Sequence, residues 1–472
     1  MGAAFFTHSF FTHSFFTHPF FTHPSVGQAL TTRELAIRAL GLYVPAVLTT
    51  VVGWQCVRTH RQIAAMLAGF CWALNALLTL QFLNLHFNWW AFHAQGGLFR
   101  SMPTDLYLGW ALLWGVLPVL CFPASRVWMV ILGFIALDLG LMPNCAPVVR
   151  LSGNWLTGEV VAAALVLLPA TLFARWSWDS SCLNLRATFW AITAMSSLLF
   201  LIPEIIFAGS GVAGIRNGGW GPLVGASTIS LNAQLQFMFL LAVPAISAAQ
   251  EFARRGLGTP IPFDPPGKLV VSGLYRYVAN PMQVSGALVL MAWGAVLRNP
   301  WLIAAGPFVV IYSLGLAAWH EKEEMPRRFG KAWWLYRRNV KNWNLRWRPW
   351  HDPHRPIPRL YIAESCGPCS EVRRWFEAHD PMSLEIVAAE DHPSRNLTRM
   401  TYDPLDGTPA EDGVAAFARG LEHLHLGWTY IGACLRLPVI RPLVQALMDA
   451  AGFGPQTVMR RECAIPQHKI VS

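Results

Sequence analysis

Two cysteines toward the C-terminal end of the chain have the spacing of a redox-active pair. Cys366 and Cys369 enclose Gly367 and Pro368, and these four residues are expected to form a turn that leads into a helix over residues 370–378. The N-terminus of a helix lowers the pKa of a nearby thiol, so we expect Cys366 to attack a disulfide and Cys369 to resolve the mixed disulfide. The spacing therefore predicts thiol–disulfide exchange.

Zinc binding is the alternative use of the same two cysteines. A zinc ion would need two further ligands, drawn from His379, His392 and Cys463. The sequence has no second Cys-x-x-Cys motif and no His-x-x-x-His pair, which zinc sites commonly contain. We therefore predict no metal site, and an inactive domain of the same fold is a further alternative.

The elements around the cysteines resemble a known redox fold. Strands are expected over residues 359–363 and 384–388, and the order strand, Cys-x-x-Cys, helix, strand is that of thioredoxin-like proteins. Three later features make the segment similar to the DCC family of thiol–disulfide oxidoreductases: Asp412-Gly413-Val414-Ala415-Ala416-Phe417, Trp428 and Leu435-Arg436-Leu437-Pro438. That family usually begins with Asp-Gly-x-Cys, where this chain has Glu364-Ser365-Cys366. The resemblance implies a thiol or disulfide partner protein.

A second set of polar and aromatic residues flanks two apolar runs, over residues 284–297 and 301–319. The set comprises Gly273-Leu274-Tyr275-Arg276-Tyr277-Val278-Ala279-Asn280-Pro281-Met282 before the runs, and His320-Glu321-Lys322-Glu323-Glu324, Phe329-Gly330, Trp333, Tyr336 and Val340 after them. This pattern resembles the membrane-embedded methyltransferases that include isoprenylcysteine carboxyl methyltransferase and the phospholipid methyltransferases.

The resemblance implies that S-adenosylmethionine binds between the hairpin and residues 329–340, and that a lipid-like or prenylated acceptor enters from the bilayer. It assigns cofactor binding to seven residues: Tyr275, Arg276, Asn280, Pro281, Glu321, Glu324 and Tyr336. The chain departs from the family pattern at several positions: Ala279, Asn280, Gln283, Ser285 and Trp333. Asn-Pro-Met also occurs in phosphatidylethanolamine methyltransferases, which favours a lipid amine. Glu321 matches the family's glutamate pair in the number of residues that separate it from Phe329, whereas Glu324 comes two to three residues too late in the sequence.

Elementary chemistry agrees with this interpretation. Methyl transfer from a sulfonium is a direct displacement, so a protein must mainly hold donor and acceptor in line and exclude water. Pro281 starts or kinks a helix and leaves nearby backbone groups free to bind a ligand. Glu321 lies at the end of an apolar run, where a carboxylate can bind both hydroxyls of a ribose. The alternative is a lipid-holding hairpin, which would leave a membrane-anchored thiol–disulfide oxidoreductase.

The rest of the chain must position these residues within a membrane. Only 13% of the residues are charged, against about 25% in soluble domains, and 54% are hydrophobic. A span needs about 20 apolar residues. Nine runs approach this length: residues 35–57, 63–85, 106–122, 127–142, 158–174, 187–208, 231–249, 284–297 and 301–319. Asp138 and Glu204 fall inside such runs and are either functional, as in a transporter pathway, or structural partners of other helices.

Basic residues set the expected orientation. One set of alternate loops carries most of them, including Arg58, Arg61, Arg126, Arg175 and Arg186, and should face the cytosol. Nine spans then place the N-terminus outside and the C-terminal domain in the cytosol. The net charge of +10 comes largely from residues 327–359, beside the last run, which favours contact with anionic lipid. No nucleic-acid partner is expected.

The sequence thus predicts a polytopic α-helical membrane protein of about nine spans with a C-terminal α/β thioredoxin-like soluble domain. The expected parts are a disordered, low-complexity tract with a repeated Phe-Phe-Thr-His motif (1–30), a transmembrane bundle (31–250), a methyltransferase-like segment (251–350), a linker (351–358) and the thioredoxin-like domain (359–472).

Overall fold

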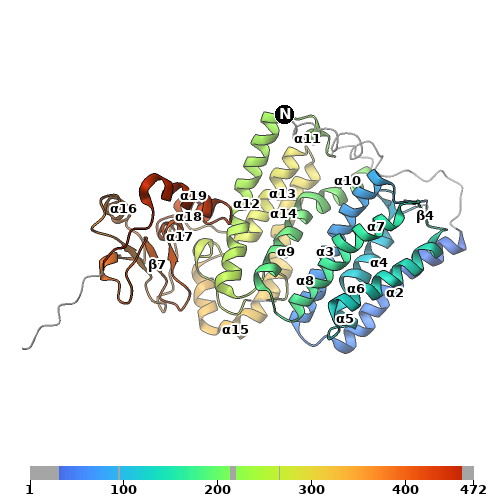
Figure 1. Cartoon of the computed structure of the whole chain (residues 1–472), viewed down its shortest axis with the longest axis horizontal. Helices are drawn as coiled ribbons and strands as arrows, with labels where there is room; N and C mark the ends of the chain where they lie inside the picture. Colours follow the sequence, from blue (N-terminus) through green and yellow to red (C-terminus); the bar gives the residue numbers. More distant parts are fainter. Residues whose placement is uncertain (1–30, 94–95, 213–218, 265, 460–472) are drawn as a thin grey trace, which may run out of the picture. The chain divides into compact units, whose positions relative to one another are not determined.

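The computed structural model describes residues 31–93, 96–212, 219–264 and 266–459. These residues are mainly helical and divide into two compact units (Figure 1). Unit 1 contains Met1–Met238, Leu257–Gly267 and Ala287–Val309, and unit 2 contains Phe239–Gly256, Lys268–Gly286 and Val310–Ser472. The histidine-containing repeat of residues 5–24 lies outside the described part of the chain.

Seven helical segments among the described residues are long and apolar enough to cross a membrane. They are α2 (Thr32–Cys56), α3 (His60–Phe87), α4 with α5 (Thr104–Gly115, Leu117–Cys121), α6 with η1 (Val127–Leu141, Met142–Cys145), α7 with η2 and α8 (Trp155–Ala162, Ala163–Leu167, Leu168–Trp178), α9 with η3 and α10 (Leu183–Ser196, Ser197–Leu201, Ile202–Val212), and α12 (Thr228–Gly256). Each overlaps one of the first seven apolar runs, so the chain is a polytopic helical membrane protein.

The expected number of nine spans is too high for the described residues. The last two runs form α13 (Pro281–Val296) and α14 (Pro300–Tyr312), which have 16 and 13 residues. At 1.5 Å per residue α13 is about 24 Å long, less than the roughly 30 Å thickness of a hydrocarbon core. The apolar run continues past α14 only as the π-helical turn η5 (Ser313–Ala317), before the charged helix α15 (Ala318–Asn339).

Small residues allow the helices of unit 1 to pack closely (Figure 1). A Cβ atom added to Gly69 of α3 would lie 2.0 Å from the carbonyl oxygen of Gly115 of α4, and one added to Gly109 of α4 would lie 2.0 Å from that of Gly41 of α2. Backbones that approach this closely are typical of helix contacts in membranes, where small side chains replace the hydrophobic effect as the driving force.

The two acidic residues predicted inside spans both have protein partners. Glu204 of α10 is fully buried, and its carboxylate takes two hydrogen bonds from Arg100, at 2.7 and 2.9 Å, and one from the indole of Trp220. Asp138 of α6 is buried beside Glu159 of α7, and the two carboxyl groups hydrogen-bond each other. Glu204 therefore forms a buried ion pair with Arg100 inside unit 1.

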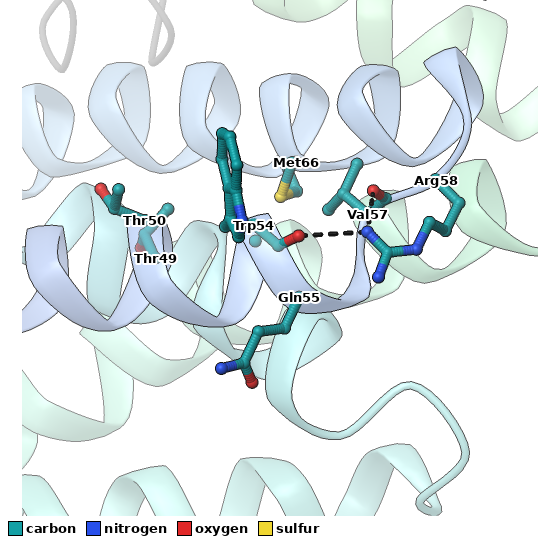
Figure 2. Close-up of a pocket in the computed structure, with 8 residues that line it drawn as sticks. Thr49, Thr50, Trp54, Gln55, Val57, Arg58 and Met66 are labelled. Carbon is teal, nitrogen blue, oxygen red and sulfur yellow. Dashed lines mark hydrogen bonds between the residues drawn. The ribbon is translucent and has the colours of Figure 1, made fainter.

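The end of α2 carries an arginine and an exposed tryptophan. Arg58 donates hydrogen bonds to the carbonyl oxygens of Trp54, at 3.1 Å, and Val57, which are left without helical donors at the end of the helix (Figure 2). These residues line an open groove of about 830 Å³ together with Thr49 and Met66. Tryptophan beside arginine is typical of a membrane–water interface, so this end of α2 marks a surface of the bilayer.

A four-stranded sheet lies in the C-terminal part of unit 2, in the strand order β6-β5-β7-β8. The strands are β5 (Arg359–Ile362), β6 (Glu385–Ala388), β7 (Thr401–Asp403) and β8 (Glu411–Asp412). β5 pairs parallel with β6 and antiparallel with β7, and β7 pairs antiparallel with β8. Helix α16 (Gly367–Ala378) connects β5 to β6, so the strand, helix and strand expected from the sequence are present.

Helices and short elements complete the described residues. Helix α17 (Val414–Leu421) follows β8 and packs with the sheet around Leu360, Phe376 and Tyr402. The other elements are β1 (Trp90–Phe92) paired with β4 (Val149–Leu151), β2 (Leu98–Phe99) paired with β3 (Met102–Pro103), α11 (Gly221–Val224), η4 (Gly273–Arg276), η6 (Ala389–Asp391), α18 (Leu426–Leu435), α19 (Ile440–Met448) and η7 (Asp449–Phe453).

Candidate functional site

The segment between α12 and α13 is held in place by a later part of unit 2. Three backbone hydrogen bonds join the two stretches: Trp350 donates to Arg276, Arg346 to Tyr277, and Ala279 to the carbonyl of Lys341. The segment begins with Gly273 at φ +60°, a conformation that disfavours residues with a side chain. The two halves of the predicted motif therefore come together in space although about 60 residues separate them.

Two of the predicted cofactor-binding tyrosines are in contact. The hydroxyl of Tyr336 donates to the carbonyl of Tyr275 at 2.9 Å, and both residues are buried. The ring of Tyr336 also packs against Trp350, with centroids 5.5 Å apart, and against Trp333, at 6.1 Å. A kink at Gly330, with φ +54°, redirects α15 before these aromatic residues, which accounts for glycine at this position of the motif.

A group of amide and hydroxyl side chains lies at the start of α13. The amide of Asn280 donates to Oε1 of Gln283 at 3.2 Å, and the hydroxyl of Ser313 donates to the same oxygen. Ser313 is the first residue of the π-helical turn η5, and such turns occur frequently at functional sites. The structure thus brings Asn280 and Pro281 close to Gln283 and Ser313. No sequence pattern indicates Ser313, and Gln283 stands out in the sequence only as a departure from the family pattern.

Arg276 is directed toward the C-terminal part of unit 2. Its Nη1 lies 3.2 Å from Nδ1 of His423, while Nε2 of His423 is 3.1 Å from the hydroxyl of Tyr402. Burial, and then the charge of Arg276, hold the pKa of His423 well below its ordinary range, so this imidazole is neutral at physiological pH. The Nε atom of Arg276 is buried and has no hydrogen-bond partner among the described residues.

Of the two predicted glutamates, the structure describes the side chain of Glu324 but not that of Glu321. Glu321 belongs to α15, but its side chain lies outside the described part of the structure. Glu324 is half-buried, with its carboxylate 3.8 Å from the guanidinium of Arg328 one turn later. Neither assignment to the cofactor is tested by these contacts.

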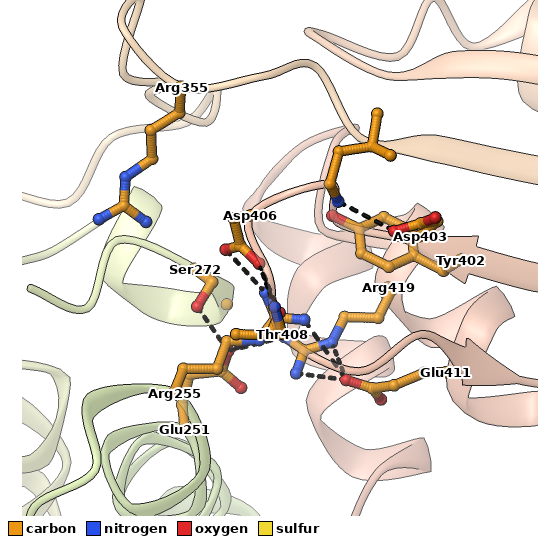
Figure 3. Close-up of polar contacts among 12 residues, drawn as sticks. Glu251, Arg255, Ser272, Arg355, Tyr402, Asp403, Asp406, Thr408, Glu411 and Arg419 are labelled. Carbon is orange, nitrogen blue, oxygen red and sulfur yellow. Dashed lines mark hydrogen bonds and ion pairs between the residues drawn. The ribbon is translucent and has the colours of Figure 1, made fainter. Parts of the chain in front are cut away.

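A buried ionic network surrounds Glu251 at the end of α12 (Figure 3). The Glu251 carboxylate accepts hydrogen bonds from Arg419 at 2.8 Å, from Arg436 at 2.9 Å and from Ser272 at 2.5 Å. Arg255 lies one helical turn further, 3.1 Å from the same carboxylate. Exposed fractions of 2% for Glu251 and Arg419 show that these charges are removed from water. Sequence reasoning missed this network, since charges after an apolar run normally face the lipid headgroups.

Glu422 extends the network to the predicted site. Its carboxylate pairs with Arg419 at 3.0 Å and with Arg436, and it accepts a hydrogen bond from the backbone N–H of Gly273 at 2.9 Å. The hydroxyl of Tyr277 donates to the Glu422 carbonyl at 3.1 Å. The segment that carries Tyr275, Arg276 and Asn280 is therefore fixed by charged residues from α12, α17 and α18.

The two cysteines lie at the N-terminus of α16. Cys366 occupies the cap position and Cys369 the first turn, and both are free thiols. Burial, followed by a hydrogen bond with Cys366, raises the pKa of Cys369 to about 12, so Cys369 stays protonated at neutral pH. Burial opposes ionisation of Glu390, but hydrogen bonds from Ser365 and Glu364 lower its pKa to about 2. The Glu390 carboxylate thus orders the loop that precedes Cys366.

The histidines considered for zinc are engaged elsewhere. His379 contacts the carbonyl of Trp375 at 2.8 Å, and Nδ1 of His392 accepts from the backbone of Ser394 and Arg395. Cys463 lies outside the described residues, and within those that are described no group of three or more His, Cys, Asp or Glu side chains is arranged to hold a metal.

Comparison with known proteins bears on one part of this site. No curated protein and no solved structure matches the chain. Residues 236–332 match the family model described as phospholipid methyltransferase. The matched stretch contains Tyr275, Arg276, Asn280, Pro281, Glu321 and Glu324, whereas Tyr336 and the two cysteines lie beyond it. Residues 236–332 are therefore similar to the phospholipid methyltransferase family, a similarity that covers about a fifth of the chain.

Proposed function

We propose that this protein transfers a methyl group from S-adenosylmethionine to a lipid-like acceptor within the membrane. The observation that carries the proposal is the phospholipid methyltransferase match over residues 236–332, which covers α13, α14 and the segment before them. The convergence of Asn280, Gln283 and Ser313 at the start of α13 supports the same location. An acceptor amine agrees with the Asn-Pro-Met sequence at this position.

The residues present suit a sulfonium nucleotide. Its carboxylate, hydroxyls and flat base need a cation, amide or hydroxyl donors and an aromatic surface, respectively. The buried Nε of Arg276 has no partner among the described residues, Asn280 supplies an amide, and Trp333 and Tyr336 are aromatic residues of the same motif. Glu321 and Glu324 are proposed to bind the ribose hydroxyls. When bound, the cofactor supplies the electrophilic methyl group.

The contribution of the chain is positioning and exclusion of water. Tyr336 fixes the backbone at Tyr275, and Gln283 links the start of α13 to η5. On α14 the side chains of Phe308 and Ile311 are more than 60% exposed, which gives lipid access to the hairpin. We propose that the acceptor enters by this apolar route.

The decisive experiment measures labelled methyl transfer from S-adenosylmethionine into a membrane lipid extract by the purified full-length chain. The methylated product is identified by its mass, and an amine-containing phospholipid is the expected acceptor. Absence of cofactor binding in calorimetry on the detergent-solubilised protein would contradict the proposal, whatever the acceptor.

The two glutamates are expected to differ when each is changed to alanine. Glu321→Ala should weaken cofactor binding more than Glu324→Ala, since the Glu324 carboxylate already lies near Arg328. Loss of a hydrogen-bonded charge typically removes about 1.5–3 kcal/mol, which is roughly a 10- to 100-fold change in the dissociation constant. Titration calorimetry of both variants measures the difference, and equal losses would assign both carboxylates to the cofactor.

We further propose that residues 359–472 form a thioredoxin-like domain with thiol–disulfide oxidoreductase activity. The strand order β6-β5-β7-β8, with its single parallel pair, and the placement of Cys366 at a helix N-terminus support this second function. The Cys366 thiolate would attack a disulfide sulfur and release one thiol. Cys369 would then attack Cys366, which releases the second thiol and leaves the chain oxidised.

This reaction predicts different behaviour for the two cysteines. Cys369→Ser should accumulate a mixed disulfide with a protein substrate such as insulin, because no thiol remains to resolve it. Cys366→Ser should form no such adduct, because Cys369 is held protonated. Non-reducing electrophoresis distinguishes the two, with the double serine variant as the control for the other cysteines. An adduct formed equally by Cys366→Ser would reverse the assigned roles.

The proposed orientation places the C-terminal domain in the cytosol. Arg58 and Arg126 lie in loops between spans, and Arg175 lies in the last turn of α8, at the loop that follows the fifth span. Seven spans from α2 to α12 place the end of α12 on the side opposite the start of α2, as nine spans would. The correction in span number therefore leaves this proposal unchanged.

A further inference from the structure

Helix α19 has one apolar face that no described residue covers. Val439, Leu443 and Leu447 follow one another at intervals of four residues and are 77%, 58% and 60% exposed. Phe453 of η7, which follows α19, is half-exposed. Spacing of four places these side chains on one side of the helix.

The opposite face of α19 is polar and is fixed to the sheet region. Gln445 accepts a hydrogen bond from the backbone of Val414 at 2.9 Å and donates to Asp449 at 2.9 Å. Asp449 in turn pairs with Arg399. These contacts set the rotation of the helix, so the apolar face is turned away from the rest of unit 2.

The preceding helix α18 lies against a membrane span. The hydroxyl of Tyr430 donates to the carbonyl of Leu240, in the middle of α12, at 2.6 Å. Leu240 is eleven residues before Glu251, or about 16 Å along the helix, and its own side chain is nearly half-exposed on the apolar part of α12. Leu437 and Ala433 of this region pack with Val243 of α12. α18 therefore extends from the level of the ionic network into the apolar length of α12.

α18 and α19 together have the composition of a membrane segment but are bent. Together the segments Leu426–Leu435 and Ile440–Phe453 are long and apolar enough to cross a membrane. The chain bends by 87° between them. The bend follows Arg436, which is anchored to Glu251 at the end of α12. α19 thus turns almost at a right angle to α18, just after Arg436 and its contact with Glu251.

We propose that α19 lies in the lipid–water interface, with Val439, Leu443, Leu447 and Phe453 inserted among the lipid acyl chains. An amphipathic helix with one apolar and one polar face binds a bilayer in this way. The proposed occupant of the apolar face is lipid because α18, which leads directly into α19, packs against the apolar length of the membrane helix α12. The C-terminal part of the chain would then be bound to the membrane along its own surface as well as through its covalent linker.

The test uses the full-length chain in phospholipid nanodiscs with a photoreactive benzophenone side chain at one position. Benzophenone at Leu443 is expected to crosslink to tagged lipid. The matched control is Arg441, which is also exposed but lies on the polar side of the same helix. A lipid-facing position, Phe239 of α12, shows that the probe and the lipid react. Labelling at Leu443 should exceed that at Arg441 about tenfold, as burial of one leucine side chain implies.

Two outcomes would overturn the proposal. Lipid labelling at Phe239 with none at Leu443 would place the apolar face in water. A crosslinked dimer at Leu443 would show that a second copy of the chain covers the face instead of lipid. If the labelled variants melt at the same temperature as the unlabelled chain, misfolding is excluded as the cause of either result.

Discussion

Replacement of Gln283 by alanine is expected to reduce methyl transfer on the order of 100-fold, the effect of displacing a positioned group by about an ångström. The Gln283 carbonyl oxygen accepts hydrogen bonds from both Asn280 and Ser313, so its loss leaves two donors without their acceptor. The change thus removes a hydrogen-bond acceptor that helps to orient the Asn280 amide at the start of α13. Labelled methyl transfer, measured with the lipid extract that supports the unchanged protein, gives the ratio.

Ser285 provides the matched control on the same helix. Its hydroxyl donates to the carbonyl of Leu241 at 2.5 Å and takes no part in the contacts of Asn280. Ser285→Ala should therefore retain activity within a few-fold of the unchanged protein. A Gln283→Ala variant that transfers methyl groups as fast as Ser285→Ala would remove this cluster from the reaction, whereas the phospholipid methyltransferase match would stand.

Glu251→Ala is expected to destabilise unit 2 by about 3–5 kcal/mol, the cost of removing one partner from a buried ion pair. The change leaves Arg419 and Arg436 buried without the carboxylate that both contact. It also frees the hydroxyl of Ser272, next to the predicted site. The apparent melting temperature of the full-length chain in detergent should fall by several degrees.

The exposed pair of Arg359 and Glu385 is the control for this prediction. Nε of Arg359 and Oε2 of Glu385 are 2.7 Å apart, as close as the charged atoms of the buried pairs, but both side chains are at least 40% exposed. Exposed pairs contribute about 0–1 kcal/mol, so Glu385→Ala should change the melting temperature little. If Glu251→Ala and Glu385→Ala lowered the melting temperature equally, burial would not make the Glu251 network more important for stability than an exposed ion pair.

The sequence predicted those features that a local pattern of hydrophobicity determines. Apolar runs predicted all seven long helices, and the order strand, Cys-x-x-Cys, helix, strand predicted β5, α16 and β6. The sequence overestimated the length of the last apolar helix, because the run of residues 301–319 passes from α14 into the π-helical turn η5. Composition does not show where a helix changes its hydrogen-bond pattern. The span number was wrong for this reason.

Contacts between distant side chains could not be predicted in the same way. Glu204 is unusual by its position inside an apolar run, but its partner Arg100 precedes it by 104 residues, and no local pattern links the two. Arg276 carried a motif assignment, and only packing shows its guanidinium beside His423. Such pairings depend on which helices become neighbours, which hydrophobic periodicity leaves open.

The ionic network also has a consequence for biosynthesis. Glu251 enters the growing chain 168 residues before Arg419 and 185 residues before Arg436. At translation rates of about 5–20 residues per second, its carboxylate waits roughly 10–30 s for Arg419 to be synthesised. During that interval the end of α12 must stay hydrated or retain a proton. A prematurely terminated chain never acquires these arginines and should be degraded by membrane quality control.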